Sequence, residues 1–127
     1  MRKGIYFVLL ILVTLLVSCK GSDTYRGEWK AMDTEGNKFE LIFAEKSFTV
    51  TNADGEIATY EYTQNSVKIN NSIKTYGIKL ADGRSLNILF PIATDESKAV
   101  IFSGENVVLY TIGRTDYISY QDIYKLN

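Results

Sequence analysis

Cys19 is the only cysteine in the 127-residue chain, and the chain contains no histidine. Thiol and imidazole groups are the usual nucleophiles and general bases of covalent catalysis, and both are common zinc ligands. The sequence therefore has no Ser-His-Asp or Cys-His arrangement, no Ser-x-x-Lys motif and no His/Cys metal cluster. We expect a protein that is not an enzyme and that carries no metal or cofactor.

Carboxylates are the remaining groups that could support acid–base or metal chemistry. Glu40 and Glu61 each alternate with apolar neighbours, so we expect both side chains to face solvent. The stretch Asp-Thr-Glu-Gly-Asn at residues 33–37 offers oxygen ligands for calcium. It lacks the further ligands of an EF-hand loop, so we expect a plain turn there.

An apolar run comes directly before the single cysteine. After a short positive start, residues 5–17 are almost entirely apolar, and the small residue Ser18 precedes Cys19. This order is typical of a secretory signal peptide. A helix over the run would span only about 20 Å at ~1.5 Å per residue, which is short of a hydrocarbon core of ~30 Å. We predict a signal peptide over residues 1–18.

The last residues of this leader, Leu16-Val17-Ser18-Cys19, resemble the lipobox of bacterial lipoproteins. The resemblance implies cleavage before Cys19, a diacylglycerol thioether on its sulfur and a further acyl chain, such as palmitate, on its amine. Several acyl chains give lasting attachment, because each buried CH₂ contributes about 0.8 kcal/mol. Lys20 stands where an aspartate would favour the inner membrane, so the resemblance implies a cell-envelope protein of the outer membrane. The periplasmic face and the cell surface both remain open.

The remainder of the chain divides into a tether over residues 19–26 and one domain over residues 27–127. Without the leader, 12 basic and 15 acidic residues remain. This balance gives no basic stripe, so we expect no nucleic-acid partner. The expected contacts are the membrane, through the lipid anchor, and either a small apolar ligand or an envelope protein.

The domain reads as a series of short strands. Turn-forming residues recur about every ten residues, and between them apolar and polar residues alternate with a period of two, as in Phe39, Leu41 and Phe43. We predict an all-β, antiparallel, up-and-down meander of about 8–10 strands that closes into a barrel, with a β-sandwich as the alternative. The Asp54-Gly55 and Asp82-Gly83 pairs predict type I′ turns.

Two short motifs resemble the lipocalins and the wider calycin group. Gly27-x-Trp29 lies on the first predicted strand, and Thr115-Asp116-Tyr117-x-x-Tyr120 is similar to a segment between two late lipocalin strands. The resemblance covers residues 25–126 and implies that Trp29 packs across the closed end of a barrel. An arginine from a late strand often packs against this tryptophan in the family, and Arg114 is the candidate. The further strand and C-terminal helix of a typical lipocalin are not predicted here.

The aromatic residues leave two functions open. A barrel of this size is either filled by side chains or holds one small ligand. In the first hypothesis a lipocalin-like domain binds a small hydrophobic or amphipathic molecule. In the second, a solid domain is an inhibitor, an immunity factor or an envelope-assembly protein that binds a protein partner, with Tyr117 and Tyr120 as the contact patch. The candidate ligand-binding residues of the first hypothesis are Phe39, Phe43, Phe48, Tyr60, Tyr62 and Phe90.

Overall fold

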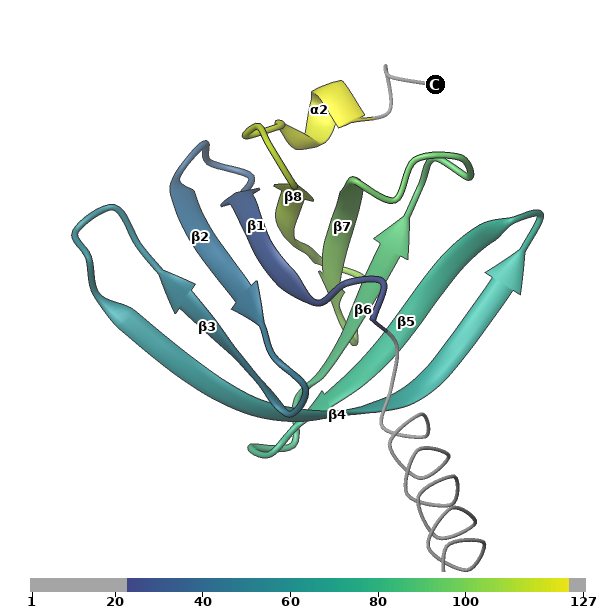
Figure 1. Ribbon diagram of the computed structural model, residues 1–127, viewed down its shortest axis with the longest axis horizontal. Coiled ribbons are helices and arrows are strands. Elements are labelled where there is room, and N and C mark those ends of the chain that lie inside the picture. The colour runs from purple at the N-terminus through teal and green to yellow at the C-terminus, as the bar shows by residue number, and fades with distance from the viewer. Residues whose placement is uncertain (1–22, 124–127) are drawn as a thin grey trace, which may run out of the picture.

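The computed structural model describes residues 23–123. The predicted signal peptide and the lipidation of Cys19 fall outside these residues. Eight antiparallel strands follow one another around a closed barrel, and a single turn of helix comes last (Figure 1). The elements are β1 (Gly27–Met32), β2 (Lys38–Phe43), β3 (Ser47–Thr51), β4 (Ile57–Asn70), β5 (Ile73–Leu80), β6 (Ser85–Phe90), β7 (Lys98–Ser103), β8 (Val108–Gly113) and α2 (Tyr120–Ile123).

The strand order confirms the predicted up-and-down barrel and rules out the sandwich. Each strand pairs with the next one along the chain, and β8 returns to pair with β1 through Lys30–Met32 and Thr111–Gly113. Because the direction reverses at every turn, alternate connections lie at the same end. The β1–β2, β3–β4, β5–β6 and β7–β8 turns therefore share one end of the barrel, and the start of β1 lies at the other.

The four turns at that shared end are built alike. In each, a three-residue loop ends in a residue with positive φ: Gly36, Gly55, Gly83 or Asn106. The backbone N–H before each loop donates to the carbonyl oxygen after it, as from Asn52 to Glu56 at 3.0 Å. This is the pattern of a type I turn followed by one left-handed residue.

The predicted type I′ turns are therefore wrong at both Asp-Gly pairs. A type I′ turn needs two residues with φ > 0, whereas only the glycine of each pair has one. The register leaves three loop residues there, so a single left-handed position is enough. The turn with two positive φ values is the β4–β5 connection, at Asn71 (φ 54°) and Ser72 (φ 67°).

β4 is the longest strand, with 14 residues, and it bends part-way along. The register to β5 shifts between Gln64 and Ser66, which marks a β-bulge. A Cβ at the facing position Gly77 would overlap the Ser66 hydroxyl, so a side chain there would force Ser66 to move. Beyond the bulge the β4–β5 hairpin extends past the other strands (Figure 1).

The segment after β8 covers part of the outer surface. Val100 and Thr111 face each other on β7 and β8, alternate with inward-facing residues, and are both almost fully buried. Ile123 of α2 is also buried, and α2 packs against β8. This short helix was not predicted from the sequence. Within residues 23–123, no helix has the length and apolar character needed to cross a bilayer.

Candidate functional site

The end of the barrel near the N-terminus is closed by Trp29. Its side chain is 2% exposed, and its indole N–H donates to the Tyr25 carbonyl at 2.8 Å. The Arg114 guanidinium stacks on the indole, 3.7 Å from the ring centroid, which is the contact expected from the sequence. Arg114 also donates to the carbonyl oxygens of Glu28 at 3.0 Å and Thr24 at 3.1 Å. One side chain thus holds three parts of the chain together.

Burial lowers the pKa of Arg114 below its usual value. An arginine remains charged after any such shift, so the contact with Trp29 is a cation–π interaction at neutral pH. Gly27 makes room for it: φ is +98° there, and a Cβ would lie 3.1 Å from the guanidinium. The glycine of the Gly-x-Trp motif is therefore required by both its backbone conformation and its neighbour.

Tyr25 is the second large aromatic residue buried in the core with Trp29. The sequence assigned it to the tether, yet its side chain is 1% exposed. Its ring meets Phe43 edge-on at 5.5 Å and lies 5.4 Å from Tyr76, and its hydroxyl donates to Gln64 at 2.8 Å. Within residues 23–123, aromatic packing and a satisfied hydroxyl leave no cavity lined by Tyr25 in the core at this end.

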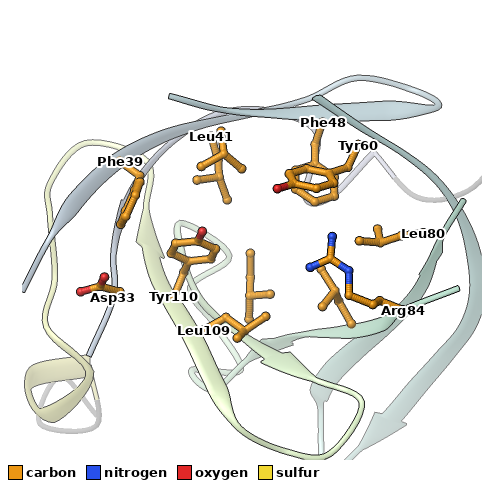
Figure 2. Close-up of a pocket in the computed structure, with 12 residues that line it drawn as sticks. Asp33, Phe39, Leu41, Phe48, Tyr60, Leu80, Arg84, Leu109 and Tyr110 are labelled. Carbon is orange, nitrogen blue, oxygen red and sulfur yellow. The ribbon is translucent and has the colours of Figure 1, made fainter. Parts of the chain in front are cut away.

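The opposite end contains a cavity of about 260 Å³ (Figure 2). Its floor is apolar and buried, and only two of its lining residues are charged. The lining residues are Asp33, Phe39, Leu41, Phe48, Val50, Tyr60, Leu80, Arg84, Leu86, Ile101, Leu109 and Tyr110. Such a lining, apolar with a few polar groups at its edge, is typical of small-molecule sites.

Arg84 is the cation at the mouth of this cavity. Its guanidinium lies 5.2 Å from the Tyr60 ring centroid and is paired with Asp82 at 2.8 Å. More than half of its side chain is exposed. Figure 2 shows the guanidinium directed over the cavity, opposite Asp33. Arg84 therefore has N–H groups near both the solvent and the apolar floor.

Asp33 and Tyr110 complete the polar edge. Partial burial acts to raise the pKa of Asp33, but hydrogen bonds from Asn37 and Glu35 outweigh it and hold that pKa below its usual value. The Asp33 carboxylate thus closes the predicted turn. Burial raises the pKa of Tyr110, so its hydroxyl stays neutral and can donate a hydrogen bond.

The six predicted interior aromatic residues lie at two depths. Phe39, Phe48 and Tyr60 line the cavity. The other three are buried in the core outside the cavity lining: Phe43, Tyr62 and Phe90. Tyr117 is half-buried, with the ammonium groups of Lys30 and Lys38 at 5.1 and 5.0 Å from its ring, and Tyr120 is also half-buried.

Sequence reasoning missed Arg84 and Tyr110 as cavity residues. Arg84 directly follows a turn. Most charged residues next to turns face solvent, so its sequence position did not indicate a role in a binding site. Tyr110 lies on a strand whose two faces are both apolar, so alternation could not orient it. The bulge between Ile101 and Phe102, opposite Tyr110, is a further irregularity that the sequence did not reveal.

A second hollow, of about 750 Å³, lies over β4 and the β2–β3 turn. Although it is larger, its lining is mostly solvent-exposed and polar, including Glu45, Lys46 and Lys79. Only Tyr62 and Leu80 of its lining are buried, whereas the smaller cavity has five buried apolar residues and is the better candidate. Among residues 23–123 no group of three or more acidic side chains is placed to hold a metal ion.

No protein-family model matches this chain, and comparison with curated protein sequences also finds no match. The closed eight-stranded antiparallel barrel is consistent with a lipocalin-like fold. The Trp29–Arg114 stack at its closed end agrees with the arrangement that the family resemblance implies.

Proposed function

We propose that the protein is a lipid-anchored lipoprotein of the bacterial envelope that binds a small amphipathic molecule at the open end of its barrel. The observation that carries the proposal is the cavity itself, which combines a buried apolar floor with the Arg84 guanidinium at its mouth. The apolar part of a ligand would replace water on the floor, and its polar head would meet Arg84. A carboxylate suits a guanidinium especially well.

The volume limits the ligand. A cavity of about 150 Å³ is enough for benzene, and pockets for drug-sized molecules begin at about 300 Å³. A cavity of about 260 Å³ therefore suits one ring with a short chain. Phenylbutyrate has this size and polarity and is a suitable probe.

A variant that fills the cavity tests the proposal. Val50 lines the cavity, and the adjacent Thr49 points away from it, where it pairs with the exposed Ile42. We expect Val50→Phe to weaken phenylbutyrate binding at least tenfold in titration calorimetry, because the added ring occupies the site. Thr49→Phe is the matched control and should change the affinity less than twofold. Equal affinities of the two variants would place binding elsewhere.

The natural ligand can be sought directly. Native mass spectrometry of the full protein purified from the envelope should show a bound molecule of one-ring size, which Val50→Phe removes. A wild-type protein that carries no such molecule and also fails to bind phenylbutyrate would contradict the proposal.

The anchor has an independent test. An alkyne-labelled fatty acid fed to cells should become attached to the wild-type protein and be absent from Cys19→Ser. Incorporation that survives the substitution would show that Cys19 is not the lipidated residue. Fractionation of the two bacterial membranes then tests the outer-membrane assignment.

A further inference from the structure

The β4–β5 hairpin has apolar side chains that nothing in residues 23–123 covers. Val67 is 48% exposed and Ile69 is 65% exposed. Both face the same side of the hairpin, because they pair with Tyr76 and Lys74 on β5. Tyr76 points into the core, so this face is continuous with the barrel interior at its closed end. Two exposed aliphatic side chains on one face of a projection make this hairpin a candidate interaction surface.

The hairpin projects at the end of the barrel where β1 starts. The Tyr76 hydroxyl donates to Thr24 Oγ1 at 3.2 Å, which fixes the start of the described chain beside the base of the projection. From Tyr76 to the tip at Ser72 is about 14 Å at ~3.4 Å per residue. From Thr24 back to Cys19 the chain reaches at most about 18 Å at ~3.6 Å per residue. The distance from Tyr76 to the hairpin tip is thus similar to the longest distance that the chain can span between Thr24 and Cys19.

The charged side chains of the hairpin itself are both lysines. Residues 65–76 contain two lysines and no acidic residue. Lys68 is exposed, and Lys74 pairs with Glu96 at 3.0 Å from the neighbouring loop. Lys68 alternates with Val67 and Ile69, so its ammonium lies on the other face of the hairpin. An exposed lysine on a projection with exposed aliphatic side chains suits the interface of a phospholipid bilayer, where apolar groups enter the acyl boundary and ammonium groups meet phosphates.

We propose that the β4–β5 hairpin rests in the surface of the membrane that holds Cys19, with Ile69 and Val67 in the headgroup and acyl boundary. The proposal rests on the proposed lipid anchor. Two attachment points, the acyl chains and the hairpin tip, fix the orientation of the barrel as well as its distance from the bilayer. The cavity then opens away from the membrane, toward the aqueous compartment.

Ile57 provides a matched control. It is 68% exposed, close to the 65% of Ile69, but it starts β4 at the opposite end of the barrel. Full-length I69C and I57C proteins are purified with Cys19 acylated, labelled with a fluorescent maleimide and reconstituted in vesicles of phosphatidylethanolamine and phosphatidylglycerol. Lipids carrying a nitroxide near the headgroup then quench any label that lies in the interface.

We expect the I69C label to be quenched at least threefold more strongly than the I57C label. Equal quenching of an acylated protein overturns the docking while the anchor stands. Self-quenching of the I69C label that rises with protein density, without lipid quenching, identifies a second copy as the occupant and also overturns it. The mass of the purified protein reports acylation separately, and an unmodified Cys19 overturns both proposals.

Discussion

Each end of the barrel places an arginine over an aromatic ring, and the two contacts differ in their surroundings. At the closed end Arg114 lies 3.7 Å from the Trp29 centroid and donates to two backbone carbonyls. At the open end Arg84 lies 5.2 Å from Tyr60, is mostly exposed and has an exposed aspartate as its partner. The same pair of chemical groups is thus built into the structure at one end and accessible to an incoming molecule at the other.

The two arginines differ in the interactions that the protein would lose if each guanidinium were removed. Removing Arg114 leaves two carbonyl oxygens without their donor and uncovers a buried indole, and both changes cost stability. Removing Arg84 exposes little that was buried, because solvent already reaches its pair with Asp82. Burial and backbone bonding, more than the residue types, decide which arginine supports folding and which is available for recognition.

Trp29→Ala should have the largest effect. A buried aromatic residue truncated to alanine costs about 3–5 kcal/mol, which is enough to unfold many domains of this size. Phe39→Ala, at the half-buried edge of the cavity, should cost only about 1–2 kcal/mol. Urea denaturation followed by circular dichroism measures both. A cost for Trp29→Ala no larger than that for Phe39→Ala would remove the distinction between the two ends.

Arg114→Lys should come next, at about 2 kcal/mol. A lysine keeps the charge but cannot stack as a plane while donating to both carbonyls. The same urea experiment on Arg84→Lys serves as the control and should show little change in the free energy of unfolding. If the two substitutions have equal cost, Arg114 is not the structural member of the pair.

Arg84→Ala should change recognition while the fold is retained. We expect phenylbutyrate binding to weaken several-fold, toward the affinity of the neutral analogue phenylbutanol, whose own binding should not change. Titration calorimetry with both molecules separates the charge contribution from the apolar one. Equal losses for the two probes would mean that Arg84 shapes the cavity without recognising a charge.

The smallest effect should appear in acid. Hydrogen bonds from Lys98 and Ser97 lower the pKa of Asp95 to about 2 in the β6–β7 loop. A lowered folded-state pKa means that this stabilisation is present above pH ~4, near the unfolded value, and is lost as the pH falls toward 2. Asp95→Asn should therefore lower the urea midpoint at pH 6 and do so much less at pH 2, where Asp95 is half protonated in the folded state.

Asp82→Asn is the control for this measurement at the open end. The pKa of Asp82 is also lowered, chiefly by its bond to Arg84, but its partner is more exposed than Lys98. We expect a weaker dependence on pH for this variant. A dependence as strong as that of Asp95→Asn would show that the exposed pair at the mouth contributes as much as the loop pair.

The sequence was sufficient for the strand pattern, and the family resemblance supplied the Trp29–Arg114 contact of the closed end, but Tyr25 was assigned to the tether. Period-two alternation and regular turn signals predict the antiparallel strands, because both are local patterns, but they left a sandwich open as the alternative to the barrel. The contact between Trp29 and Arg114 was expected only because the Gly27-x-Trp29 motif resembles a known family. Turn type could not be predicted at Asp54-Gly55, since the same dipeptide suits loops of two or three residues and register decides between them.

The cavity could not be predicted for a different reason. Alternation shows that Phe43 and Phe48 point inward, but their depth along the barrel axis depends on how far neighbouring strands are staggered. Stagger is set by hydrogen-bond register between strands, which no single strand encodes. The interior is therefore filled by side chains around Trp29 at one end of the barrel and hollow at the other end.

The four similar turns around the open end affect how fast a bound molecule could leave the cavity. Each is short, and its backbone groups are bonded within the turn or by its own Asp, Asn or Ser side chain. No described segment at this end has to swing aside before a molecule leaves, so residence time should depend on contacts with the cavity walls alone. For a ligand of one ring those contacts are few, and exchange should be rapid.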